Sequence, residues 1–107
     1  MVGYELFSRG DLEGLSKFFH PGCSIKVNGT HALSGEYNGF ASFASNFLAK
    51  LNTVWPGFSI EIEKVVSNKT DVCVFVKTTA DNLSTRSIHH FVVENGLEVE
   101  FNVHDDN

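Results

Sequence analysis

The stretch FASFASNFLAKLNTVWPGFSIEIE, residues 40–63, changes its hydrophobic period partway along its length. In its first half, apolar residues recur every three or four positions, as on the buried face of a helix. After Pro56-Gly57 every second residue is apolar, which is the period of a half-buried strand. The stretch therefore predicts a helix over residues 40–51, followed after a turn by a strand that starts near Phe58.

Short alternating segments fill the rest of the chain. We predict further strands over residues 71–79, 85–94 and 97–104, with Asn95-Gly96 as a tight hairpin turn between the last two. Val65-Val66 breaks the alternation of the first strand, as a bulge in a bending strand does. Consecutive strands joined by short turns favour an antiparallel meander.

The first part of the chain is mainly helical in pattern. A short helical piece is expected over Val2–Ser8, and an amphipathic helix over residues 11–20, capped by Asp11 and stopped by Pro21-Gly22. A brief strand, residues 23–27, and a loop with turn signals follow. We therefore predict one α+β domain, residues 1–107, with helices on one face of a curved antiparallel sheet.

Composition excludes several classes of function. The net charge of the 107 residues is −5, and the eight Lys and Arg residues are scattered, so neither nucleic acid nor an anionic membrane is an expected partner. No apolar run approaches the roughly 20 residues that span a bilayer. The first ten residues lack the basic-then-apolar order of a signal peptide, so we expect a cytoplasmic protein.

Motifs for metal, cofactor or nucleophilic chemistry are missing from the sequence. Cys23 and Cys73 lie in apolar strand-like segments and are expected to be buried, reduced thiols. No His, Cys or carboxylate residues lie at metal-ligand spacing, and neither a nucleophile elbow nor a phosphate-binding glycine loop is present. We expect no metal and no cofactor.

Four segments carry a resemblance to a known family: FSRGDLEGL at 7–15, FFHP at 18–21, LSGEYNG at 33–39 and HHFVVENG at 89–96. In this order and spacing the chain resembles SnoaL-like members of the nuclear-transport-factor-2-like superfamily. The resemblance implies a cone-shaped α+β roll with the element order α-α-β-α-β-β-β-β, in which helices and a strongly bent sheet enclose a pocket. The superfamily includes both enzymes and binding modules, so the fold does not settle the function.

Asp105 is the first candidate for chemistry. The alternation of the last strand directs Val99, Phe101 and Val103 inward, and the same phase includes Asp105. The resemblance implies an acid/base aspartate near the end of this strand, at the position of Asp105. The simpler interpretation, which we favour, is a solvated side chain at the end of the chain.

His89 is the second candidate. The phase of its strand directs His89 and Phe91 inward and His90 outward. An inward imidazole is able to donate to a ligand or to pair with Asp105 as an acid/base couple. The alternative is a buried histidine satisfied by a backbone carbonyl or by water.

A closer resemblance to ketosteroid isomerases fails at one position. The base aspartate of those enzymes would fall at Val27, where no carboxylate stands. Their oxyanion-site tyrosine would fall near Gly3, next to Tyr4, and their protonated aspartate near His89 or Ser87. Steroid isomerisation by that arrangement is not expected.

Aromatic residues are the expected lining of the pocket, although Tyr37 and Trp55 fit ordinary packing equally well. The predicted lining is Phe18, Tyr37, Phe43, Phe47, Trp55, Phe91 and Phe101. An apolar outer sheet face is also expected and predicts a homodimer. Its residues are Cys73, Phe75, Ile88 and Val92.

Three functions remain open. The preferred hypothesis is a pocket protein that binds a small hydrophobic molecule, because the expected inward polar set is sparse. The first alternative is a SnoaL-like lyase, isomerase or hydrolase that uses Asp105 and His89 as an acid/base pair without a cofactor. The second is a dimerisation or protein-interaction module with a filled interior.

Overall fold

The computed structural model describes residues 2–28, 33–81 and 83–105, except for the side chains of Val2, Asn52 and Asp105. Its helical segments precede most of its strands. The elements are α1 (Val2–Ser8), α2 (Leu12–Ser16), β1 (Phe19–Val27), β2 (Gly35–Asn38), α3 (Phe40–Asn46), the 3-10 turn η1 (Leu48–Lys50), α4 (Leu51–Val54), β3 (Ser59–Ser67), β4 (Asp71–Ala80), β5 (Leu83–Glu94) and β6 (Leu97–Asp105).

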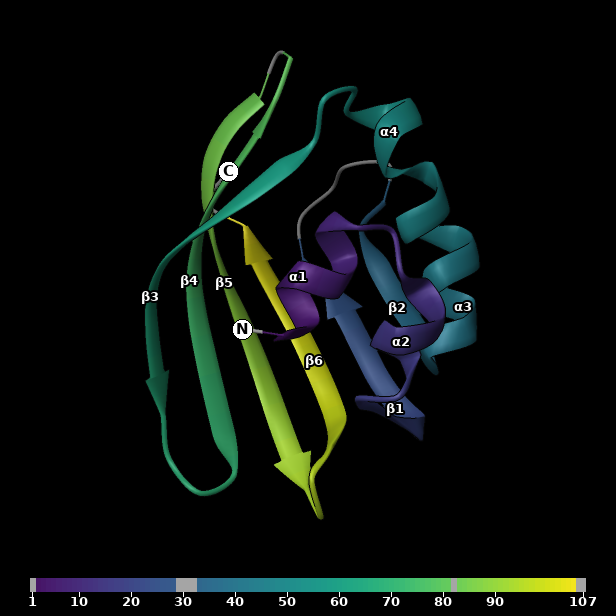
Figure 1. The fold of residues 1–107 in the computed structure, drawn as a ribbon, viewed down its shortest axis with the longest axis vertical. Coiled ribbons are helices and arrows are strands. Elements are labelled where there is room, and N and C mark those ends of the chain that lie inside the picture. The colour runs from purple at the N-terminus through teal and green to yellow at the C-terminus, as the bar shows by residue number, and fades with distance from the viewer. Residues whose placement is uncertain (1, 29–32, 82, 106–107) are drawn as a thin grey trace.

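One six-stranded sheet runs through the molecule in the order β2-β1-β6-β5-β4-β3. The meander β3 to β6 is antiparallel throughout, as predicted. β1 lies parallel to β6, so the sheet is mixed rather than wholly antiparallel. Figure 1 shows the helices gathered on one side of this curved sheet, which confirms the α+β fold class.

The core lies between the helices and the concave side of the sheet. Val74 and Val76 of β4 and Ile25 of β1 are completely buried there, while Phe43 of α3 packs over them with little exposure. The side chains between them in β4 are only partly buried. The strand alternation read from the sequence is therefore correct for this part of the sheet.

The second helix is shorter than the predicted residues 11–20. Asp11 caps it as expected, accepting a hydrogen bond from the Gly14 amide at 2.9 Å, but α2 ends at Ser16. The chain becomes extended at Phe19, because the Glu98 amide donates to the Phe18 carbonyl at 2.8 Å and Phe19 pairs with β6. Tertiary pairing thus overrides the local helical period.

The predicted helix over residues 40–51 is broken into α3, η1 and the start of α4. Its buried face is nevertheless the predicted one, since Phe43, Phe47 and Leu51 are all buried. None of the helices in the described part of the chain is long and apolar enough to cross a membrane.

Two details of the strands also differ from the sequence prediction. β2 forms where a loop was expected, because residues 35–38 pair with β1. The irregularity in β3 falls between Ile62 and Lys64, not at Val65-Val66, so both valines lie in regular pairing and are exposed.

Candidate functional site

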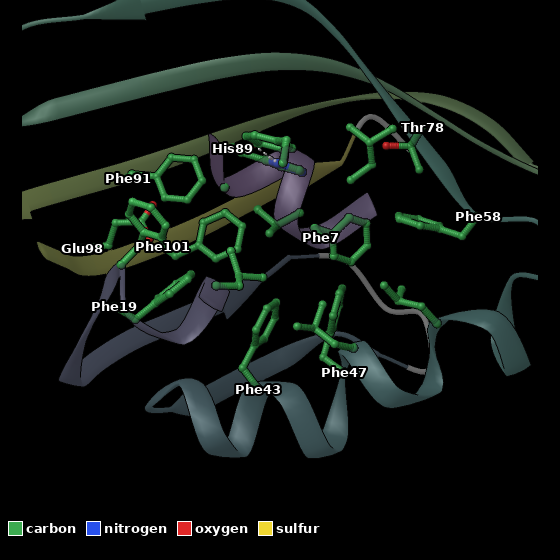
Figure 2. A pocket seen from close by; sticks show the side chains of 18 of the residues that line it. Phe7, Phe19, Phe43, Phe47, Phe58, Thr78, His89, Phe91, Glu98 and Phe101 are labelled. Carbon is green, nitrogen blue, oxygen red and sulfur yellow. Dashed lines mark hydrogen bonds between the residues drawn. The ribbon is translucent and has the colours of Figure 1, made fainter. Parts of the chain in front are cut away.

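A cavity of about 440 Å³ opens between the helices and the concave side of the sheet. Figure 2 shows side chains from both layers pointing into it, most of them aromatic. Phe43 and Phe47 come from α3, Phe91 from β5 and Phe101 from β6. Such a volume and such a lining are typical of sites for small organic molecules.

The aromatic wall is held by ring packing. Phe91 and Phe101 stack across β5 and β6 with centroids 4.5 Å apart, and Phe43 stacks on Phe47 at 4.7 Å. Phe43 also meets Phe101 edge to face at 5.8 Å, which joins the helix layer to the sheet. Because each ring supports the next, the wall keeps its shape without a ligand.

His89 is the polar group in the middle of the cavity. It projects from β5, is 7% exposed, and its Nδ1 lies 2.6 Å from the Tyr4 hydroxyl of α1. Burial, assisted by the charge of Glu98, holds the pKa of Tyr4 well above its ordinary value, so the phenol keeps its proton. When that proton is donated to Nδ1, the neutral imidazole carries its own proton on Nε2.

Glu98 enters the cavity because of an irregularity in β6. Val92 pairs with Glu100 and Val93 with Glu98, which leaves Val99 as an extra residue on β6. A bulge of one residue reverses the phase of the strand beyond it. Glu98 therefore lines the cavity instead of facing outward, as strict alternation predicts.

The Glu98 carboxyl lies in a poorly solvated place. Burial raises its pKa from 4.5 to about 7, so near neutral pH the group is able to hold or release a proton. No hydrogen bond or ion pair to this carboxyl is found among the described residues, and Phe91 and Phe101 lie beside it in Figure 2. It is thus a titratable group on an apolar wall.

The sequence of the chain also matches a known protein family. The sequence profile of the SnoaL-like domain matches residues 3–101 of the chain. The chain belongs to the SnoaL-like domain family. No match was found among the curated proteins.

Solved structures share the fold of this SnoaL-like domain. Bal32a, from a soil-derived mobile gene cassette, superposes with a TM-score of 0.88 at 19% identity over 98% of this chain and 84% of its own. An NTF2-like protein from Burkholderia thailandensis superposes with a TM-score of 0.86 at 17% identity, over 97% of this chain and 85% of its own. TerC, co-crystallised with polyporic acid, superposes with a TM-score of 0.84 at 22% identity, over 97% of this chain and 85% of its own.

The residues predicted to line the pocket of this SnoaL-like domain all border the cavity except Tyr37. Tyr37 packs edge to face on Phe43 and Phe47, with centroids 5.7 and 5.9 Å away, and its hydroxyl donates to the Leu33 carbonyl at 2.7 Å. Tyr37 therefore supports the aromatic wall from β2 rather than forming part of the lining.

Asp105 is described only in its backbone. It is the last residue of β6 and pairs with Ser87, two residues along β5 from His89. Its side chain lies outside the described part of the chain, so a pairing with His89 stays a prediction. Asp106 and Asn107, which follow it, also lie outside the described residues.

Of the polar residues that line the cavity, Tyr4, Thr78, Thr85 and Glu98 were not predicted from the sequence, and Tyr4 and Glu98 are the titratable ones. Tyr4 lies in α1, and its only sequence signal was its place next to the position of a ketosteroid isomerase tyrosine. Glu98 had no signal, because its strand alternates regularly in sequence and the bulge arises only on pairing.

Burial disfavours the reactive form of the Cys23 thiol. Cys23 and Cys73 are free, and burial raises the pKa of Cys23 to about 11, aided by the charges of Glu98 and Glu100. Such a thiol is a poor nucleophile at neutral pH. Within the described residues no three His, Cys, Asp or Glu side chains lie close enough to hold a metal ion.

Proposed function

We propose that this SnoaL-like domain binds a small, mainly apolar organic molecule in the cavity between α3 and the sheet. The observation that carries the proposal is the cavity of about 440 Å³ with its stacked aromatic wall. Burial of apolar ligand surface supplies the affinity, and the few polar groups set the orientation. TerC, which shares the fold, was crystallised with polyporic acid, and this supports the same use of the cone here.

A pair of neighbouring substitutions tests the binding site. Leu48 lines the cavity and Ala49, next to it in η1, is exposed. Leu48→Trp fills part of the cavity, so we expect it to weaken binding of the fluorescent probe 2-naphthol at least tenfold, whereas Ala49→Trp leaves affinity unchanged. Fluorescence titration measures both. Equal affinity in the two variants, or no binding by the unsubstituted protein, would rule out the cavity as the site.

The second candidate function is acid/base catalysis, favoured by the Tyr4–His89 hydrogen bond inside the cavity. In this role Asp105 removes a proton from a carbon next to a carbonyl, and the electron pair moves to the carbonyl oxygen. The His89 Nε2–H group stabilises that oxygen as its charge develops. Return of the proton to another carbon completes an isomerisation without a cofactor.

Hydrogen exchange on a simple ketone tests the catalytic role. We expect the protein to speed the incorporation of deuterium at C1 of 2-tetralone in D₂O, followed by NMR, and His89→Asn to abolish this acceleration. His90→Asn is the matched control, because His90 lies on the other face of β5 and bonds to Asp71 at 2.7 Å. If deuterium exchange in the presence of the unsubstituted protein proceeds at the uncatalysed rate, the proposed catalytic role is wrong.

A homodimer through the outer sheet face is part of the proposal. The side chains of Cys73, Phe75, Ile88 and Val92 lie on the face opposite the cavity and are partly exposed. The alternative of an interaction module with a filled interior is less well supported, because the interior holds a cavity.

A further inference from the structure

Glu98 is the titratable group of the cavity lining that the proposed function leaves without a role. It reaches the lining only through the extra residue Val99 in β6, which places it opposite Val93. Bulges of this kind commonly re-aim a side chain beside a site. The position is fixed, because the Glu98 amide also bonds to the Phe18 carbonyl at 2.8 Å and so ties β6 to the start of β1.

The surroundings of Glu98 differ from those of acidic groups on the outer face. Glu63 bonds to Arg86 at 3.1 Å, and Asp71 bonds to His90 at 2.7 Å. For the Glu98 carboxyl the described residues supply no donor. A poorly solvated carboxylate without a hydrogen bond costs free energy, so a donor on the bound molecule would satisfy it.

Glu98 lies at one end of the cavity, away from the Tyr4–His89 pair. The backbone positions of His89 and Val93 are four residues apart on β5, which is roughly 13 Å along the strand, and Glu98 pairs with Val93. Aromatic side chains, including Phe91 and Phe101, occupy the space between them (Figure 2). A ligand for this cavity is therefore apolar in its middle and polar at the end beside Glu98.

We propose that Glu98 is the specificity-determining residue of the cavity, and that it selects phenols: flat apolar molecules whose hydroxyl donates a hydrogen bond to its carboxylate. This inference rests on the proposed binding function and names its ligand class. Burial, assisted by the charge of Glu98, raises the pKa of the Tyr4 phenol and of the Cys23 thiol, so both groups stay protonated and neutral and neither brings a second negative charge to the cavity. Burial raises the pKa of Glu98 to about 7, as expected for a poorly solvated carboxyl to which the described residues donate no hydrogen bond.

Two probes of nearly the same shape test the selection. 2-Naphthol has a hydroxyl that donates a hydrogen bond, and 2-methoxynaphthalene does not. We expect the unsubstituted protein at pH 8 to bind 2-naphthol about tenfold more tightly than the ether, as one hydrogen bond to a charged acceptor predicts. In Glu98→Leu the affinities for the two probes should become nearly equal, because the acceptor is gone and the apolar wall stays.

Glu100→Gln is the matched control, since Glu100 pairs with Val92 on the outer face of the same hairpin. It should keep the tenfold preference. Glu98→Gln keeps the size of the side chain and should lower the preference at least threefold, which provides a second variant if Glu98→Leu folds poorly in circular dichroism.

The outcomes separate the two proposals. Binding of both probes with no preference in the unsubstituted protein, or a preference that survives in both Glu98 variants, would overturn the role of Glu98 and keep the binding function. Failure of the unsubstituted protein to bind either probe would overturn both.

Discussion

Glu98 shows how far a single residue can depart from its sequence pattern. In sequence it alternates with Leu97 and Val99 as any outward strand residue does, yet in the structure it lines the cavity. His89 and Phe101 follow their patterns, because β5 and the second half of β6 pair without interruption. The side chains that follow regular pairing could be predicted, and the one beyond a bulge could not.

The pH dependence of the free energy of unfolding should reveal the partly buried Glu98 carboxyl. Burial raises the pKa of Glu98 from 4.5 to about 7, so the folded protein keeps a proton that the unfolded chain releases between these values. The protonated Glu98 carboxyl therefore contributes its full stabilisation of the folded state below pH 4.5, and this contribution is lost as the pH rises through 7. We expect the free energy of unfolding to fall over this window, relative to Glu98→Gln, by on the order of 3 kcal/mol.

Urea unfolding at pH 5, 6, 7 and 8 measures this difference. Glu100→Gln removes a carboxylate from the outer face of β6 and should keep the pH profile of the unsubstituted protein. Parallel profiles for Glu98→Gln and the unsubstituted protein would contradict the raised pKa.

Phe101 is the residue on which the aromatic wall depends most. Its ring contacts the rings of Phe91, Phe43 and His89 at centroid distances of 4.5, 5.8 and 5.5 Å. We expect Phe101→Ala to lower the free energy of unfolding by about 3–5 kcal/mol. Phe18→Ala is the control: Phe18 is 39% exposed, so thermal or urea unfolding should show a much smaller loss.

At the scale of elements, the turn between β5 and β6 is where sequence and structure agree best. Asn95 and Gly96 have φ values of 51° and 80°, as both central residues of a type I′ turn require. Gly96→Ala meets no steric neighbour within 4 Å, so its cost comes from the left-handed backbone alone. We expect a loss of about 1–2 kcal/mol in the free energy of unfolding.

Gly22→Ala is the control for this prediction, because the φ of Gly22 is not positive. Denaturant midpoints of the two variants, compared with the unsubstituted protein, measure the difference. An equal effect at both positions would show that the turn conformation is not the cause.

The elements that sequence predicted poorly are those whose ends depend on distant partners. Residues 17–20 have a helical period, but Phe19 pairs with Glu98, nearly 80 positions further along the chain. β2 has turn residues in its sequence and becomes a strand only beside β1. Helix faces and hairpins depend on near neighbours, and for this reason the sequence predicted them well.

At the scale of the whole molecule, the sheet has two different faces. The concave face carries the cavity, and the outer face carries both apolar and polar side chains, among them a polar group in which His90 lies 2.7 Å from Asp71 and 3.4 Å from the Asn102 amide. Because this polar group is satisfied within the chain, it adds little cost when the face is covered. The outer face is thus suited to pairing with a second copy of the chain.

Light scattering after size exclusion tests the proposed homodimer. Ile88 lies between Phe75 of β4 and His104 of β6 in the middle of the outer face. We expect twice the chain mass for the unsubstituted protein at micromolar concentration, and the single chain mass for Ile88→Lys, because burial of an unpaired ammonium opposes association. Ser84→Lys adds the same charge at an exposed position near the start of β5 and should stay dimeric. A monomeric unsubstituted protein would exclude the dimer, and the apolar outer face would then need another partner.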